Sequence, residues 1–200
     1  MNITVFSGTF NPIHTGHLII AESVREELKQ EKILFIPAYS PPHRAKDIAI
    51  AEHRLYMTNL AIADNPFFEA SDIEFNLKER RKSYSYFTVK KLFEENTDIS
   101  GKINFIVGSD AFSLIDSWHE AEKLAELVNF VIVARYEKLN FEELFEKIKL
   151  KHFSYQLVKA PVLEISSSSI RDKIKRNKSI KYLVPKTVEE YIHENSLYYT

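Results

Sequence analysis

The part of the sequence that decides the fold is Val5-Phe6-Ser7-Gly8-Thr9-Phe10-Asn11-Pro12-Ile13-His14-Thr15-Gly16-His17-Leu18. It begins as a short apolar run, which is typical of a buried strand, and then passes through Gly8, Asn11 and Pro12, which break regular structure. From Thr15 onward the apolar and polar residues follow a helical period. A strand, a tight loop and the start of a helix therefore follow one another. The unpaired backbone N–H groups of that helix point at whatever lies above the end of the strand.

Two histidines in this stretch predict a site for an anion. His14 and His17 are three residues apart in the first helical turn, so their rings can face the same point, and Gly8 and Gly16 let backbone approach a ligand closely. A zinc site is the main alternative, but the chain has no Cys, no third ligand lies nearby, and the positive end of a helix dipole disfavours a cation. The loop also lacks the G-x-G-x-x-G of a dinucleotide-binding fold. We predict a polyphosphate site of another type.

Composition limits the class of protein. The chain has 200 residues, of which 44% are hydrophobic, so one domain over residues 1–200 is expected. A formal net charge of −1 argues against nucleic acid as a partner, and the lack of Cys excludes disulfides and thiolate chemistry. No apolar run approaches the length of a membrane span, and Met1-Asn2-Ile3-Thr4 lacks the basic start of a signal peptide. We expect a cytoplasmic protein with no membrane partner.

Short apolar segments alternate with helical patterns, which predicts an α/β fold. We expect strands at residues 3–6, 33–36, 67–70, 103–107, 130–133 and 155–158, and helices near 15–31, 51–64, 84–96, 121–127 and 141–149. This alternation is typical of a Rossmann-like, doubly wound parallel sheet with helices on both faces. The C-terminal part, from about residue 165 to 200, is expected to be helical. Ligands of such sheets bind at the carboxyl ends of the strands, where residues 7–17 would lie.

A second candidate anion site is Ile165-Ser166-Ser167-Ser168-Ser169-Ile170-Arg171. Serine hydroxyls and backbone N–H groups would point outward from the helix that begins here. Arg171 lies in the first turn, where its charge opposes the helix dipole, so a phosphate group would stabilise it. The alternative interpretation is a serine-capped helix with an exposed arginine. Two such turns, far apart in the chain, predict an anion site more strongly than either turn alone.

Three further segments could contact a ligand. Gly108-Ser109-Asp110 offers a close backbone approach and a carboxylate for ribose hydroxyls, although Asp110 could simply cap the next helix. Trp118, the only tryptophan, lies in a polar stretch and is either a core residue or a stacking surface for a pyridinium ring. The proline-rich loop at residues 37–46 carries cations that include Arg44. We interpret the helix around Arg54 as packing, and the basic run Lys78–Lys82 as a solvated loop.

These motifs resemble those of one enzyme family. Thr9–His17 resembles the T/HxGH signature of the nucleotidyltransferase superfamily, which is related to the HIGH motif of class I aminoacyl-tRNA synthetases. The version here is most similar to that of bacterial nicotinate-nucleotide adenylyltransferases. Their PPHK, HR-x-x-M, SYT-x-x-TL, GxD, ISSTxIR and closing VP-x-x-V segments have counterparts here in the same order, over nearly the whole chain. Arg44 replaces their Lys and Ser168 their Thr, and Ser85 and Val89 depart from the SYT-x-x-TL segment.

The resemblance implies a HIGH-type nucleotidyltransferase fold and transfer of the adenylyl group of ATP to nicotinate mononucleotide, with release of pyrophosphate. His14, His17 and Arg171 would be catalytic, with His17 at the α-phosphate. ATP would contact Gly8, Thr9, Phe10, His14, His17, Gly108, Asp110, Ser168, Ile170 and Arg171. The mononucleotide would contact Arg44, Thr88, Asp110, Trp118 and His119. Mg²⁺ would be held by the ATP phosphates, with no protein side chain as a metal ligand.

Two alternatives stay open at this stage. One is another enzyme of the same fold, such as a phosphopantetheine adenylyltransferase or a cytidylyltransferase, against which the Ser83–Val89 segment and Trp118 argue. The other is a non-catalytic nucleotide-binding protein, against which His14, His17 and Arg171 argue. The sequence also leaves open a homodimer and the choice between nicotinate and nicotinamide.

Overall fold

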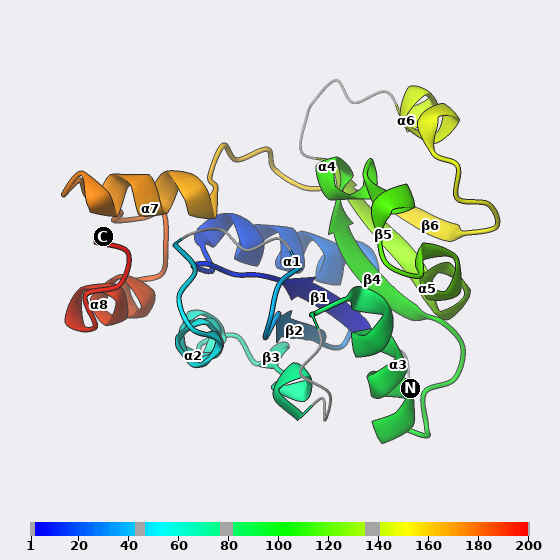
Figure 1. The fold of residues 1–200 in the computed structure, drawn as a ribbon, viewed down its shortest axis with the longest axis horizontal. Coiled ribbons are helices and arrows are strands. Elements are labelled where there is room, and N and C mark those ends of the chain that lie inside the picture. Colours follow the sequence, from blue (N-terminus) through cyan, green and yellow to red (C-terminus); the bar gives the residue numbers. More distant parts are fainter. Residues whose placement is uncertain (1–2, 43–46, 77–81, 135–140, 200) are drawn as a thin grey trace.

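The fold is built on a sheet of six parallel strands, seen in the computed structural model of residues 3–42, 47–76, 82–134 and 141–199 (Figure 1). The strand order is β3-β2-β1-β4-β5-β6. The strands are β1 (Thr4–Gly8), β2 (Ile33–Pro37), β3 (Phe68–Ala70), β4 (Ile103–Gly108), β5 (Val128–Ala134) and β6 (Ser154–Lys159). This arrangement confirms the predicted doubly wound α/β class, in which the strand order reverses between β1 and β4.

Helices connect the strands, and two more follow the last strand at the C-terminal end of the chain. They are α1 (Thr15–Glu27), α2 (Ala51–Ile62), α3 (Ser85–Glu95), α4 (Ser109–Phe112), α5 (Ala121–Leu127), α6 (Phe141–Lys147), α7 (Ser167–Lys175) and α8 (Lys186–Glu194), with short 3₁₀ segments η1 (Ile73–Asn76) and η2 (Ile115–Ser117). Helix α1 ends at Glu27 instead of Glu31, because Lys29 has a left-handed φ of 50° and the Gln30 N–H bonds back to the Arg25 carbonyl. Within the described ranges, no helix has the length and apolar character needed to cross a membrane.

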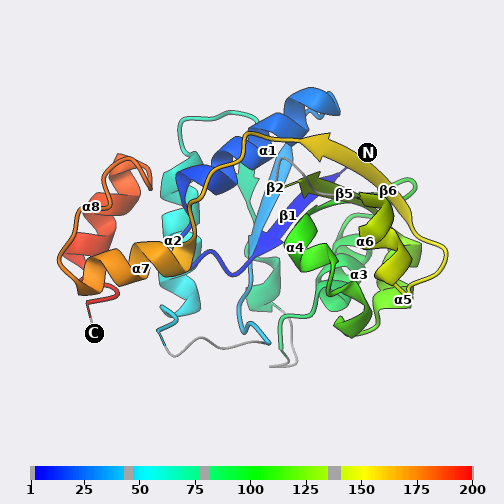
Figure 2. The same ribbon diagram turned by 90° about the horizontal axis from the view of Figure 1, so that it is seen from above.

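Both faces of the sheet are buried by helices. Neighbouring residues of one strand point to opposite faces, so Val5 and Phe6 of β1 belong to different hydrophobic clusters. Helices α1, α2, α7 and α8 contribute to the cluster around Phe6, and α3, α4 and α5 to the cluster around Val5. Figure 2 shows α7 and α8 at one end of the molecule and α3 and α5 at the other.

Strands β1 and β4 separate toward the carboxyl edge of the sheet. Strand β1 pairs with β2 from Thr4↔Ile33 to Gly8↔Pro37. Its described pairing with β4 comprises only Thr4↔Asn104 and Val5↔Phe105. The rest of the two strands therefore diverges at the point where the strand order reverses. A ligand site is expected at such a point in an open parallel sheet.

Candidate functional site

A cleft with a volume of ≈ 780 Å³ opens where β1 and β4 separate. This size suits a nucleotide-sized ligand. Of the residues predicted to bind substrates, the cleft is lined by Gly8, Thr9, Phe10, His17, Gly108, Asp110, Trp118 and His119. It thus brings together residues from the loop after β1 with residues more than ninety positions later, after β4. Arg44 lies outside the described residues, as do residues 78–81 of the basic run.

The two histidines of the first motif are stacked on each other. Their ring centroids are 3.7 Å apart and the rings are inclined by 24°. The backbone N–H of His14 donates to Nδ1 of His17 at 3.2 Å. Because an amide N–H only donates, Nδ1 of His17 is an acceptor, and the neutral ring carries its proton on Nε2. The ring edge bearing Nε2 is then a hydrogen-bond donor in a residue that lines the cleft.

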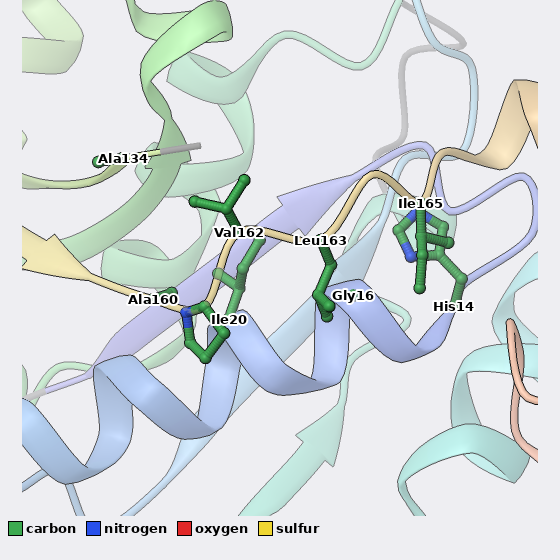
Figure 3. Close-up of a pocket in the computed structure, with 9 residues that line it drawn as sticks. His14, Gly16, Ile20, Ala134, Ala160, Val162, Leu163 and Ile165 are labelled. Carbon is green, nitrogen blue, oxygen red and sulfur yellow. The ribbon is translucent and has the colours of Figure 1, made fainter. Parts of the chain in front are cut away.

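His14 faces a different space from His17. It is 4% exposed and lines a small apolar hollow of ≈ 20 Å³ between α1 and the chain after β6 (Figure 3). The other lining residues are Gly16, Ile20, Ala134, Ala160, Pro161, Val162, Leu163 and Ile165. A Cβ atom on Gly16 would lie 3.1 Å from His14 Nδ1, so glycine is what lets the imidazole lie against the helix. The stacked rings therefore lie between the cleft and the hollow.

The second motif begins helix α7 and contacts the first motif. Ser166 caps the helix, since its hydroxyl oxygen accepts from the Ser169 N–H at 3.1 Å. The Ser167 hydroxyl donates to the Pro12 carbonyl at 2.9 Å, and Arg171 Nη1 donates to the Asn11 carbonyl at 2.9 Å. The start of α7 thus contacts residues 11–12, which lie just before the histidine pair in the sequence. The serine turn is a helix cap, as one interpretation had it, but Arg171 is half-buried against the first motif and not exposed. The phosphate site stays a prediction.

The remaining predicted residues of this motif do not line the cleft. Ile170 is fully buried in the hydrophobic core, so its side chain cannot reach ATP, which corrects that assignment. Ser168 and Arg171 also lie outside the cleft lining. Arg171 Nε is buried and has no hydrogen-bond partner among the described residues. A guanidinium with an unsatisfied N–H beside the Asn11 loop is suited to an added oxygen acceptor.

Thr88 is not at the cleft surface, and this corrects its predicted contact with the mononucleotide. Its side chain is 0% exposed and its hydroxyl donates to Glu74 Oε1 at 2.6 Å. The residues of that segment that do line the cleft are Ser83, Tyr84 and Ser85, at the start of α3. The sequence interpretation missed them, although a serine at a helix start was visible in it.

Aromatic side chains form the cleft wall beyond α3. Trp118 packs edge-to-face on Phe105, with ring centroids 6.3 Å apart, and also lines the cleft. The His119 ring stacks on Tyr84 at 4.4 Å and 24°. Together these rings join the segment after β4 to the start of α3. The wall suits a flat aromatic ring, and the first N–H groups of α3 suit a negative charge beside it.

A buried arginine supports the loops beneath the cleft. Arg54 is 1% exposed and its guanidinium donates to three carbonyls, those of Ala49 at 2.9 Å, Thr9 at 2.8 Å and Tyr39 at 3.2 Å. Burial lowers its pKa, and nearby acidic groups that include Glu74 oppose this shift. The guanidinium stays charged in either case. The sequence interpretation gave the Arg54 helix a packing role. In the structure Arg54 also holds the loop that carries Thr9.

Comparison with known proteins gives consistent matches over the whole chain. The model of the family described as cytidylyltransferase-like matches residues 5–173. A probable nicotinate-nucleotide adenylyltransferase of Caldicellulosiruptor bescii is 38% identical over 200 residues, covering 99% of each chain. One of Thermoanaerobacter sp. is 40% identical over 208 residues, covering 99% of this chain and 94% of that one. Among solved structures, Plasmodium falciparum nicotinic acid mononucleotide adenylyltransferase complexed with NaAD has a TM-score of 0.80 at 23% identity, over 98% and 97% of the two chains.

Proposed function

The chain belongs to the cytidylyltransferase-like family and, within it, to the nicotinate-nucleotide adenylyltransferases, and we propose from this that it makes nicotinate adenine dinucleotide in NAD biosynthesis. The substrates are ATP and nicotinate mononucleotide, and the second product is pyrophosphate. The observation that carries the proposal is the position of His17, whose ring borders a nucleotide-sized cleft with its Nε2 as a donor.

The reaction is a displacement at the α-phosphorus of ATP. An oxygen of the mononucleotide phosphate forms a bond to that phosphorus, and the bond from the phosphorus to the oxygen bridging to the β-phosphate breaks. Pyrophosphate leaves with that oxygen. The attacking group is already an anion, so the enzyme needs no general base. Catalysis depends on positioning the two phosphates and on neutralising charge as the leaving group departs.

The two motifs have different roles in this reaction. His17 donates from Nε2 to an oxygen of the α-phosphate, and the stacked His14 holds the His17 ring in place. Arg171, fixed by the Asn11 carbonyl, supplies positive charge to the departing pyrophosphate together with the Ser168 hydroxyl. The glycine-containing loop Gly8–Phe10 and the Gly108–Asp110 turn take the nucleotide. Substitution of His17 tests the first of these assignments.

The mononucleotide is assigned to the aromatic wall. Its pyridine ring stacks on Trp118, and its carboxylate is met by the start of α3 at Ser85, with His119 closing the wall. Nicotinate carries this carboxylate and nicotinamide does not. Arg44 follows the cleft residues Pro41 and Pro42 in sequence and is assigned to the mononucleotide phosphate.

The cleft fits Mg²⁺ carried by ATP and not a dedicated protein cage. Asp110 is the single carboxylate among the described lining residues, and no group of three or more metal-ligating side chains occurs in the described ranges. Mg²⁺ keeps several waters and binds through one carboxylate and substrate phosphates. Mg²⁺ held in this way would supply positive charge beside the leaving pyrophosphate. Asp110 would be the lining carboxylate available to it.

Pyrophosphate release tests the proposal. We expect release from ATP with nicotinate mononucleotide and Mg²⁺, and much slower release with nicotinamide mononucleotide, because the carboxylate is missing. Release with CTP or with phosphopantetheine, and none with nicotinate mononucleotide, would overturn it. Tight ATP binding without release would identify a non-catalytic protein. Light scattering of the purified chain tests whether it is a homodimer, and limited proteolysis tests whether it is a single domain. We also propose that the enzyme is cytoplasmic.

A further inference from the structure

A chain of buried hydrogen bonds runs beneath the cleft from the phosphate side to the aromatic wall. Arg54 Nη1 donates to the Thr9 carbonyl at 2.8 Å and Nη2 to the Tyr39 carbonyl at 3.2 Å. The Tyr39 N–H donates to Glu74 Oε2 at 2.8 Å, and the Thr88 hydroxyl donates to Glu74 Oε1 at 2.6 Å. We call this set, Arg54, Tyr39, Glu74 and Thr88, the sub-cleft relay. It connects the loop after β1 to helix α3.

The relay is continued by a second connection at the start of α3. The Ser40 N–H donates to the Ser83 hydroxyl at 2.8 Å, and the Ser83 N–H donates to the Ser40 carbonyl at 2.8 Å. The backbone of Tyr39 and Ser40 is thus hydrogen-bonded to Arg54 on one side and to Glu74 and Ser83 on the other. The start of α3 cannot shift without breaking its hydrogen bonds to these two residues.

Because Glu74 and Thr88 are buried, water cannot replace a hydrogen bond that either of them loses. Glu74 is 3% exposed, so its carboxylate depends on the Tyr39 N–H and the Thr88 hydroxyl in place of water. Loss of one partner leaves a buried charge partly unsatisfied, and the structure then rearranges to bring in solvent. We expect this rearrangement at the start of α3, because Ser85 there lines the cleft, from which solvent can enter.

We propose that Glu74 and Thr88 are positioning residues for the mononucleotide: they fix the start of α3 at the distance from the phosphate loop that the substrate requires. Neither residue touches substrate. This inference rests on the proposed function, since it assigns the mononucleotide to the wall formed by α3 and Trp118. It also gives Thr88 a role, in place of the direct contact predicted for it.

The test is the isosteric substitution Thr88→Val, which removes the hydroxyl and keeps the shape. If the aligned position of α3 falls to about a tenth of the population, the apparent affinity for the mononucleotide falls by the same factor. We therefore expect the KM for nicotinate mononucleotide to rise about tenfold. The KM for ATP and kcat should change by less than about twofold, because the phosphate loop keeps its own bonds to Arg54.

A matched control is Thr58→Val in α2. Thr58 is equally buried, at 0% exposed, but its hydroxyl donates to the Arg54 carbonyl one turn earlier in the same helix. This variant should lose stability without any change in either KM. Glu74→Gln is the conservative rescue, because its amide can accept from Tyr39 and donate to Thr88, and the mononucleotide KM should stay within about threefold of wild type.

Several results would overturn the proposal. A merely structural role lowers the fraction of folded enzyme and hence kcat, and leaves KM unchanged. Thr88→Val with a wild-type mononucleotide KM and a lowered Tm, as for Thr58→Val, would therefore refute it. Glu74→Asp, whose carboxylate is one methylene shorter and cannot reach both donors, must also raise this KM. A wild-type enzyme that releases no pyrophosphate from nicotinate mononucleotide would instead refute the proposed function.

Discussion

Gly16 offers a sharp test of the histidine pair, because the structure predicts that adding one methyl group lowers activity without unfolding the protein. A Cβ at this position would lie 3.1 Å from His14 Nδ1 and 3.2 Å from His14 Cε1. Comfortable contacts begin near 3.5 Å, so the imidazole has to retreat by roughly 0.3–0.5 Å. The ring cannot retreat alone, since it is stacked on His17 with centroids 3.7 Å apart. The displacement therefore reaches the ring that borders the cleft.

The size of the effect follows from this displacement. A misplacement of about 1 Å in a catalytic group costs about 10²-fold in rate, so half of that corresponds to roughly tenfold in kcat for Gly16→Ala. Stability should change little. Alanine in place of glycine stabilises a helix by about 0.5–1 kcal/mol, which offsets much of the roughly 1 kcal/mol cost of crowding. We expect kcat to fall about tenfold while Tm stays within a few degrees.

Gly101→Ala provides the opposite pattern. Gly101 has a φ of +84° and nothing within 4 Å of an added Cβ, so alanine there is strained but contacts nothing. We expect a Tm lower by several degrees, from a cost of about 1–2 kcal/mol, with unchanged kcat. Pyrophosphate release at saturating substrates and a thermal melt measure both variants. A kcat for Gly16→Ala within twofold of wild type, or activity that follows Tm in both variants, would refute the reasoning.

Three further predictions concern the cleft and the surface. His17→Ala should lower kcat by about 10²-fold, which is the scale for losing one positioned hydrogen-bond donor. A kcat near that of wild type would show that His17 has no catalytic role. Trp118→Ala should raise the mononucleotide KM roughly tenfold, and Trp118→Phe should raise it less. An unchanged KM would mean that the indole serves only to pack on Phe105. The hydrogen bond from Arg25 lowers the pKa of Glu22 from its ordinary value. Glu22 therefore stabilises the fold above its unfolded pKa, and the stability difference between wild type and Glu22→Gln should disappear as the pH falls through its folded pKa. A difference in urea unfolding that is constant from pH 7 to pH 3 would contradict this.

Local patterns in the sequence were sufficient to predict the order and type of the elements. Apolar runs, turn residues and helical periods are read over a few residues, and each predicted strand and helix is found with only its ends shifted. The serine turn could be recognised as a helix start because its cap is formed by Ser166 and Ser169, three residues apart. Chemistry that depends on short spacing, such as the pairing of His14 with His17, was visible for the same reason.

Only the tertiary structure decided which of these residues face the cleft. Thr88 is one helical turn beyond Ser85, about 4.5 Å deeper along α3, so it lies on a buried carboxylate while Ser85 lines the cleft. The bond from Arg171 to Asn11 joins residues 160 positions apart, and the three carbonyls held by Arg54 come from two separate connections, one after β1 and one between β2 and α2. Such contacts depend on how distant segments pack and not on the periodicity of any one of them. The sequence alone therefore determines the elements and the chemistry available, and the packing determines where that chemistry can act.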